Sequence, residues 1–159
     1  MRNLSSILSS IVCAATLLAA THSASAQTPM NGLLRQVYEN IDGGTLADLT
    51  NNAAFPDSPT SQNIVTDYFE APTDVMDYYG QRMRALILPP TTGSYTFWIA
   101  SDDASGLYLS TDETPANRRT IAWVSGWTPS RSWAVEANQQ SSPVSLQAGK
   151  KYYIEALMK

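Results

Sequence analysis

Short stretches of alternating apolar and polar residues follow one another along the chain, and turn-forming residues separate them. Alternation with a period of two is typical of half-buried β-strands, and proline or glycine between such runs indicates turns. Only 45–52 has the pattern of a helical turn, which Thr45 is placed to cap. We therefore expect an all-β fold, an antiparallel β-sandwich or barrel. The expected strands are 32–38, 64–72, 79–90, 94–101, 107–111, 119–125 and two strands within 144–159 that a turn at Gly149 separates.

Two of these runs predict where side chains point and which strands pair. In 79–90 the alternation turns Arg82 and Arg84 outward and the apolar residues between them inward. The runs 94–101 and 107–111 are separated by the short sequence "DDASG". A short connection that contains glycine predicts that these two runs form a β-hairpin with "DDASG" at its tip.

The first 26 residues have the organisation of a secretory signal peptide. Arg2 gives a basic start, and the apolar stretch 7–20 is short and rich in serine. The triplet 24–26, Ala-Ser-Ala, matches the small-residue pattern of a cleavage site. We expect the mature domain to be 27–159, without a stable membrane span, and secreted to the extracellular space or the periplasm. The alternative is that the apolar stretch is kept as a membrane anchor.

Cleavage of residues 1–26 removes the chemistry of thiols and imidazoles. The single cysteine, Cys13, and the single histidine, His22, both lie in the expected signal peptide. The mature domain then has no disulfide, no Ser-His-Asp triad and no zinc site built from His or Cys. Carboxylates, hydroxyls and amides remain, and such oxygen ligands suit hard cations, chiefly calcium.

The charge of the mature domain argues against polyanionic partners. Nine Lys or Arg residues remain after Arg2 is removed, against fourteen Asp and Glu, for a net charge of −5. The basic residues are scattered along the chain and form no basic patch in the sequence. We therefore expect no nucleic acid among the partners.

Two adjacent carboxylates, Asp102 and Asp103, follow the aromatic run "SYTFWIA". One interpretation is a turn, because aspartate bonds readily to nearby backbone amides. A second is a pair of carboxylates for glycoside hydrolysis, with Glu136 or Glu155 as the second group at a separation of about 5–10 Å. A third is a calcium site, because a Ca²⁺ ion takes about six to eight oxygen ligands and would offset the repulsion between neighbouring carboxylates.

The longest informative stretch is "YGQRMRALILPPTTGSYTFWIASDDASGLYLSTDETPANRRTIAWVSGW". It resembles the protective antigen (PA) fourteen-kilodalton domain family, which is named after the anthrax toxin protective antigen. The segments "GLLRQVYENIDGGTLADLTNN" and "SLQAGKKYYIEALMK" resemble the opening and a late strand of that family, so the resemblance covers about Gly32 to Lys159. It implies a β-sandwich or barrel with jelly-roll character. It also implies that Asp102 and Asp103 hold a calcium ion and are joined by a cis peptide, as in the sugar-binding members.

The resemblance also implies that part of the site lies elsewhere. In sugar-binding members the remaining calcium ligands are on a loop after the strand that "KKYYIEALMK" matches, and this sequence ends at Lys159. We therefore expect a domain that lacks its C-terminal closing strand and has an incomplete calcium site.

Aromatic residues are the other candidates for contact with a sugar, because an aromatic ring can stack on a sugar face. Trp127 and Trp133 lie in an irregular stretch and are the expected ligand-binding residues, with packing as the alternative for each. Trp98 and Trp123 lie within expected strands and are expected in the core.

The function expected from these features is a secreted, lectin-like, carbohydrate-binding domain that uses calcium. Its partners would be a glycan or cell-wall polysaccharide and other domains of a longer cell-surface protein, such as an adhesin. The alternative is a non-catalytic structural or protein-interaction module. We expect no enzymatic activity in the domain itself, although it could be an accessory part of a glycoside-acting enzyme.

Overall fold

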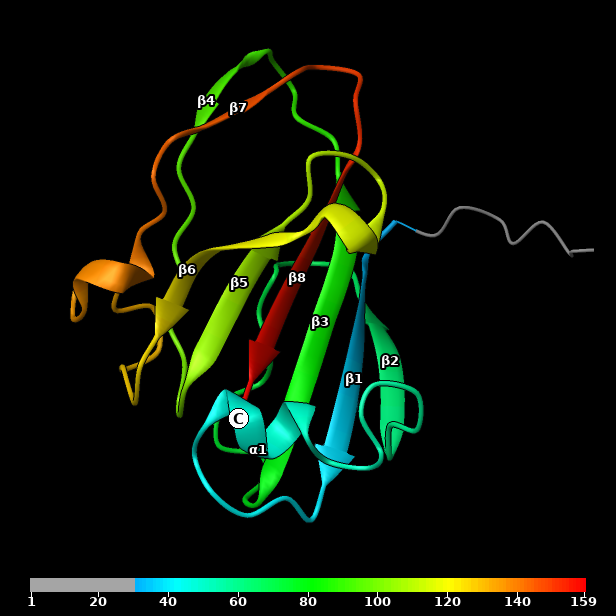
Figure 1. Ribbon diagram of the computed structural model, residues 1–159, viewed down its shortest axis with the longest axis vertical. Coiled ribbons are helices and arrows are strands. Elements are labelled where there is room, and N and C mark those ends of the chain that lie inside the picture. Colours follow the sequence, from blue (N-terminus) through cyan, green and yellow to red (C-terminus); the bar gives the residue numbers. More distant parts are fainter. Residues whose placement is uncertain (1–30) are drawn as a thin grey trace, which may run out of the picture.

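Six antiparallel strands form the larger of two β-sheets in the computed structural model, which describes residues 31–159 (Figure 1). The strand order is β2-β1-β3-β8-β5-β6, so this sheet is open, with β2 and β6 at its edges. A second sheet contains only β4 and β7. The strands are β1 Leu33–Glu39, β2 Ser61–Val65, β3 Tyr79–Ile87, β4 Gly93–Tyr95, β5 Ser105–Leu109, β6 Arg119–Val124, β7 Val144–Leu146 and β8 Tyr152–Met158.

The main hydrophobic core lies between the two sheets, as in a β-sandwich. Alternate residues of β5, β6 and β8 point from the large sheet into this core, because successive side chains of a strand face opposite ways. Ile99 and Leu146 close the core from the second layer, with Phe97 packed against it. The all-β sandwich expected from the sequence is thus confirmed. Its buried residues are Ile99, Leu107, Leu109, Ala122, Val124, Leu146, Tyr152 and Ile154.

The other face of the large sheet is partly covered by the helix α1, Leu46–Thr50. Thr45 caps it as predicted, and Asp48 completes the capping box by accepting the backbone N–H of Thr45 at 2.9 Å. Leu49 of this helix is fully buried with Tyr38 and Leu157 of the sheet. Figure 1 shows the C-terminus, at the end of β8, beside α1.

The predicted hairpin of 94–101 and 107–111 is wrong. β4 pairs with β7, whereas β5 pairs with β6 and β8. The physical reason is that Phe97 and Ile99 contribute to the core from the second layer, so the chain must change layers before β5 begins. The aspartate pair lies at this crossing.

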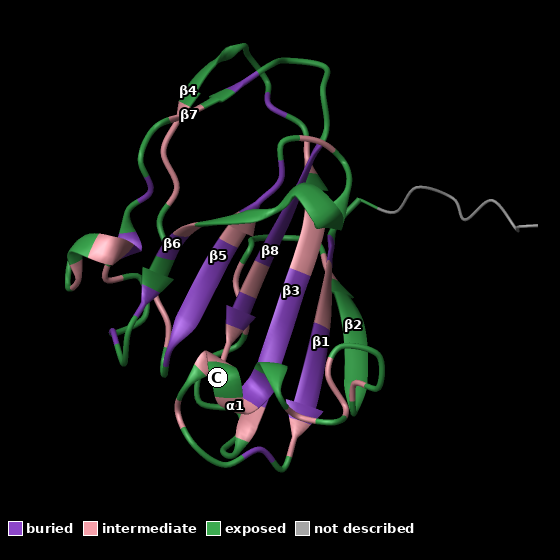
Figure 2. Cartoon of the chain, viewed as in Figure 1, coloured by how far each residue is buried: buried purple, intermediate pink, exposed green. Residues whose placement is uncertain are grey.

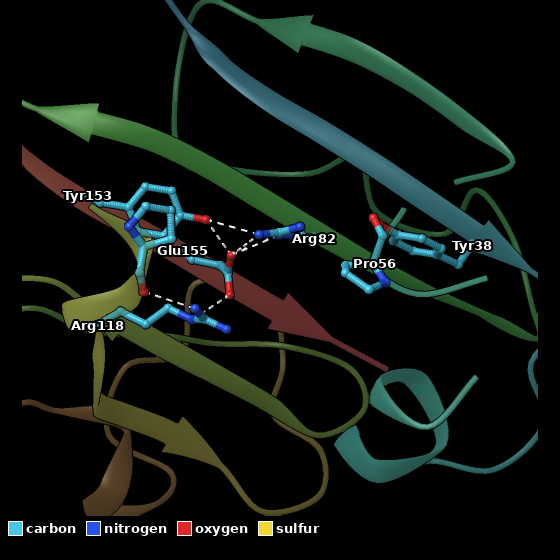
Figure 3. Close-up of polar contacts among 7 residues, drawn as sticks. Tyr38, Pro56, Arg82, Arg118, Tyr153 and Glu155 are labelled. Carbon is cyan, nitrogen blue, oxygen red and sulfur yellow. Dashed lines mark hydrogen bonds and ion pairs between the residues drawn. The ribbon is translucent and has the colours of Figure 1, made fainter. Parts of the chain in front are cut away.

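The prediction for Arg82 is also wrong, because its side chain is only 10% exposed. Arg82 faces the side of the sheet that carries Glu155, a residue with 0% exposure. Figure 3 shows Glu155 between Arg82 and Arg118, with the hydroxyl of Tyr153 donating to the same carboxylate. The Arg82–Glu155 ion pair measures 2.7 Å and the Arg118–Glu155 pair 3.2 Å. A single alternation pattern cannot reveal a sheet that is buried on both faces.

The edge strand β2 lies earlier in the chain than the expected strand 64–72. Its first four residues are exposed, in agreement with the edge position seen in Figure 2. The expected signal peptide, 1–26, lies outside the described residues. Within 31–159, no helix is long and apolar enough to cross a membrane.

Candidate functional site

Asp102 and Asp103 lie where the chain passes from the second layer to β5, and both are exposed. The peptide bond between them is cis, as the family resemblance implied. The backbone N–H of Asp103 donates to the carbonyl of Lys159 at 2.9 Å. The hydroxyl of Ser101 donates to the carbonyl of Asp103 at 2.6 Å. The pair is therefore tied to the end of β8 by backbone hydrogen bonds.

Gly44 closes one side of the aspartate pair. Its carbonyl accepts the backbone N–H of Ala104 at 3.4 Å. A Cβ atom at Gly44 would lie 3.2 Å from Oδ2 of Asp103, closer than ordinary van der Waals contact. The absence of a side chain at this position therefore lets the loop before α1 approach the carboxylate. The sequence marked Gly44 only as part of a turn, and nothing in it signalled this approach.

The two carboxylates influence each other electrostatically. The pKa of Asp102 is raised, first by partial burial and then by a hydrogen bond with Asp103 and its negative charge. A hydrogen bond from the side chain of Trp127 acts in the opposite direction. Asp74 adds a smaller upward contribution to this pKa, which places a third carboxylate in the electrostatic surroundings of the pair. No sequence pattern signalled that Asp74 lies near the pair.

Trp127, one of the two tryptophans expected to contact a sugar, lies directly beside the aspartate pair. It forms an isolated antiparallel bridge with Asp102. The next residue, Thr128, donates its backbone N–H to the carbonyl of Ser101 at 2.8 Å and is 1% exposed. This buried anchor holds the half-exposed indole of Trp127 next to the carboxylate of Asp102.

Trp133 lies in a different place. It lines a surface groove of about 500 Å³ together with Thr96, Phe97 and Trp98. The expected placement of Trp98 in the core is wrong, because it is 46% exposed. Trp123 was expected in the core as well and is 44% exposed. Large apolar residues in strands were assigned to the core, but both of these side chains point away from it.

Both glutamates considered as the second carboxylate of a glycosidase pair, Glu136 and Glu155, are engaged in other interactions. The carboxylate of Glu155 is enclosed within the sheet and paired with Arg82 and Arg118. The carboxylate of Glu136 accepts the backbone N–H of Ser125 at 2.9 Å. Among the described residues, no group of three or more His, Cys, Asp or Glu side chains is arranged to hold a metal ion.

The PA14 domain family matches residues 31–158. An N-acetyl-beta-glucosaminyl-glycoprotein 4-beta-N-acetylgalactosaminyltransferase 1 of Mus musculus is 35% identical over 127 residues, which are 77% of this chain and 12% of the transferase. Fibrocystin of Canis lupus familiaris is 27% identical over 139 residues, which are 82% of this chain and 3% of fibrocystin. The chain therefore spans only a small part of the length of these relatives.

A solved structure with a similar fold is the Epithelial Adhesin 9 A domain of Candida glabrata in complex with Galβ1-4GlcNAc. The two chains share 15% sequence identity with a TM-score of 0.51. The similarity covers 81% of this chain and 75% of the adhesin domain. At this level of identity the likeness concerns the fold.

Proposed function

Since this chain belongs to the PA14 domain family, we propose that it is an exported, lectin-like module that binds a glycan through a calcium ion held by Asp102 and Asp103. The observation that carries the proposal is the pair of exposed, adjacent carboxylates, with Gly44 next to Asp103 and Trp127 next to Asp102. Fold does not determine function, so the proposal depends on this site.

The residues at the site fit a calcium ion. Carboxylate oxygens are the ligands that calcium prefers, and Asp102 and Asp103 would supply them. A Cβ at Gly44 would crowd the carboxylate of Asp103, so the glycine keeps the space beside that oxygen open. When bound, the ion would offset the repulsion between the carboxylates and leave coordination positions for hydroxyl groups of a sugar.

The other residues of the site have roles that need no catalysis. Trp127 is bridged to Asp102 through the backbone and presents its half-exposed ring to solvent. An exposed indole next to a polar centre suits a pyranose, which has apolar faces and hydroxyl-bearing edges. The site would therefore bind a sugar by its hydroxyls and by one ring face.

Two relatives support a glycan as the ligand class. The adhesin domain of similar fold is in complex with Galβ1-4GlcNAc. The mouse relative, by its name, transfers N-acetylgalactosamine to a glycoprotein glycan, and this chain corresponds to 12% of it. We infer that the module is a non-catalytic, glycan-binding part of a longer, cell-surface or secreted protein. A terminal galactosyl unit is a reasonable first probe.

The alternative function is a structural or protein-interaction module. It is favoured by the absence, within 31–159, of a third side chain arranged with the aspartates to hold a metal. It is also favoured by fibrocystin, in which the matching segment is 3% of the chain. Under this alternative the sandwich would contact neighbouring domains and bind no sugar.

Titration calorimetry with Galβ1-4GlcNAc, in calcium and in EDTA, separates the two functions. We expect heat of binding in calcium, none in EDTA and none for Asp102→Asn. Asp57→Asn is the matched control, because this exposed aspartate lies in the loop after α1 and outside the site. Equal heats of binding with and without calcium would favour the structural module. The absence of binding to every glycan of a broad array would favour it as well.

A further inference from the structure

We propose that the groove lined by Thr96, Phe97, Trp98 and Trp133 is a second sugar subsite, so that the ligand is a glycan chain of several units. This inference rests on the function proposed above and extends its site. The groove has a volume of about 500 Å³. Trp98 is 46% exposed and Trp133 48%, so both indoles offer ring surface to a ligand.

The groove and the aspartate pair lie on one continuous segment of the chain. Trp98 and Asp102 each form an antiparallel bridge, with Gln140 and Trp127 respectively. Side chains of an extended segment alternate between its two faces. Ile99 is buried in the core, whereas Trp98 and, four positions later, Asp102 are exposed, so both lie on the side of the segment that faces away from the core.

The length of this segment sets the size of the ligand. Asp102 is the fourth residue after Trp98, which corresponds to a span of up to about 13 Å at about 3.3 Å per residue. A single pyranose ring is much shorter than this span. A ligand that contacts the aspartate pair and also stacks on Trp98 must therefore contain several linked sugar units.

Gln139 positions Trp133 over the same segment. Its side chain is fully buried, and its Nε2 donates to the carbonyls of Ile99 at 2.9 Å and Ser132 at 2.6 Å. Its Oε1 accepts the backbone N–H groups of Val135 at 2.7 Å and Glu136 at 2.8 Å. The loop is thus fixed on both sides of Trp133 and joined to the strand that carries Trp98. A ring fixed before binding loses little conformational entropy when a ligand stacks on it.

The chemistry of the groove favours a neutral sugar over a charged partner. None of the four lining residues is ionisable, and the only polar side chain is the hydroxyl of Thr96. Two indole rings and a hydroxyl complement the apolar faces and hydroxyl edges of a pyranose. The segment 98–102 joins the groove to the aspartate pair, where the first unit of the same glycan would bind.

The test is a length series of one glycan, titrated into the protein in calcium. The probes are Galβ1-4GlcNAc and the tetrasaccharide and hexasaccharide that repeat it. We expect the longer probes to bind on the order of tenfold more tightly than the disaccharide, the size of effect that one good aromatic contact produces. Trp98→Ala should abolish this gain and leave the affinity for the disaccharide unchanged.

Trp123→Ala is the matched control, because Trp123 is exposed to a similar extent, 44%, and does not line the groove. It should keep the full gain. Trp98→Phe, which preserves a ring, should keep part of it. A thermal melt of each variant shows whether it is folded, and the indole N–H signals of the wild-type protein should respond to the tetrasaccharide at Trp98.

The possible outcomes separate this inference from the proposed function. Calcium-dependent binding that is equal for all lengths and unaffected by Trp98→Ala would overturn the second subsite alone. No calcium-dependent binding of any probe would overturn both. Self-association of the wild-type chain that Trp98→Ala abolishes would assign the groove to a second copy and overturn the inference.

Discussion

At the scale of single residues, the site depends on the closeness of Gly44 to Asp103. The hydrogen of the glycine takes the place of a Cβ that would lie 3.2 Å from the carboxylate oxygen. Adding that atom would displace the side chain of Asp103 by a few tenths of an ångström. Shifts of this size matter at a metal site, because the ligand atoms must meet at one point.

Gly44→Ala should therefore lower the affinity for calcium on the order of tenfold, as changes behind a ligand often do. Gly126→Ala is the control, because a Cβ there meets nothing within 4 Å. Calorimetry with calcium chloride measures both variants. Equal affinities for the two variants would show that the Asp103 carboxylate does not need the space beside Gly44.

A second prediction at the residue scale concerns the stability of the fold, which depends on the ion pair between Arg82 and Glu155 inside the sheet. Arg82→Ala would leave the enclosed carboxylate of Glu155 without its nearest cation. We expect this to reduce the free energy of unfolding by about 3–5 kcal/mol. Arg131→Ala removes the exposed Arg131–Glu70 pair and should cost no more than about 1 kcal/mol. Urea denaturation of the two variants makes the comparison.

Replacing both partners of the buried pair, as Arg82→Met with Glu155→Leu, should recover most of the lost stability, because no buried charge is then left unpaired. Arg118, which also loses Glu155, has a side chain that is 39% exposed and so reaches water. If Arg82→Ala and Arg131→Ala destabilised the fold equally, the buried pair would have no special role.

At the scale of elements, Gln139 is the side chain that fixes the part of the β6–β7 connection that carries Trp133. Gln139 bonds to four backbone groups, which belong to the loop itself and to the segment of Trp98. Gln139→Ala would leave these four backbone groups without this partner, and the carbonyl of Ile99, whose bond is buried, would cost about 1–3 kcal/mol if unpaired. Gln140→Ala, next in the chain but exposed, is the control and should be nearly neutral.

Hydrogen exchange measures this effect at the loop. The amides of Val135 and Glu136 should lose protection in Gln139→Ala and keep it in Gln140→Ala, and the tetrasaccharide should lose more affinity than the disaccharide. Unchanged exchange at both amides would mean that the loop is held by other contacts.

The elements also show how far the sequence could lead. The alternation of residues in β1, β3, β6 and β8 revealed these strands, because one face of each is apolar. The partner of 94–101 could not be read, since pairing joins segments that are distant in sequence and a short connection favours a hairpin locally. The burial of Arg82 depends on Glu155 in another strand, which no local pattern records.

The candidate site was predictable to a similar degree. The aspartate pair stood out because two neighbouring carboxylates after an aromatic run are unusual and resemble a family motif. Of the two tryptophans expected to contact a sugar, Trp127 lies beside the pair, whereas Trp133 lies in the groove with Trp98. Gly44, Asp74 and Trp98 were missed as site residues, because only the folded chain brings them to their positions.

At the scale of the whole molecule, burial of tyrosines links stability to alkaline pH. The pKa values of Tyr38, Tyr79, Tyr108 and Tyr153 are all raised above the ordinary 10.0, with burial as the largest cause. The unfolded chain loses these protons near pH 10, while the folded chain keeps them to higher pH. The contribution of these tyrosines to the free energy of unfolding should therefore be constant below pH 10 and fall as the pH rises through the folded pKa values.

Urea denaturation between pH 8 and 11 measures this dependence. Tyr153→Phe should fall less steeply than the wild-type protein, because one of the shifted groups is gone. An identical slope would contradict the assignment of a raised pKa to Tyr153.

The whole molecule consists of an open, six-stranded sheet and a small second layer, and the residues proposed to bind the glycan are exposed. Within the segment 96–102, Ile99 is buried in the core between the layers, whereas Trp98 and Asp102 are exposed and belong to the proposed binding surface. The relatives carry this module as a small part of much longer chains. Its proposed contribution to such a chain is recognition of a glycan.

The central claim is that Asp102 and Asp103 together bind a calcium ion that a glycan then shares. Calorimetric titration of Galβ1-4GlcNAc into the wild-type chain, with the free calcium concentration raised in steps from EDTA, tests it most directly. The account predicts that the glycan affinity rises with calcium until the metal site is saturated, and that Asp103→Asn abolishes the rise. A glycan affinity that is the same at every calcium concentration and in Asp103→Asn would contradict it.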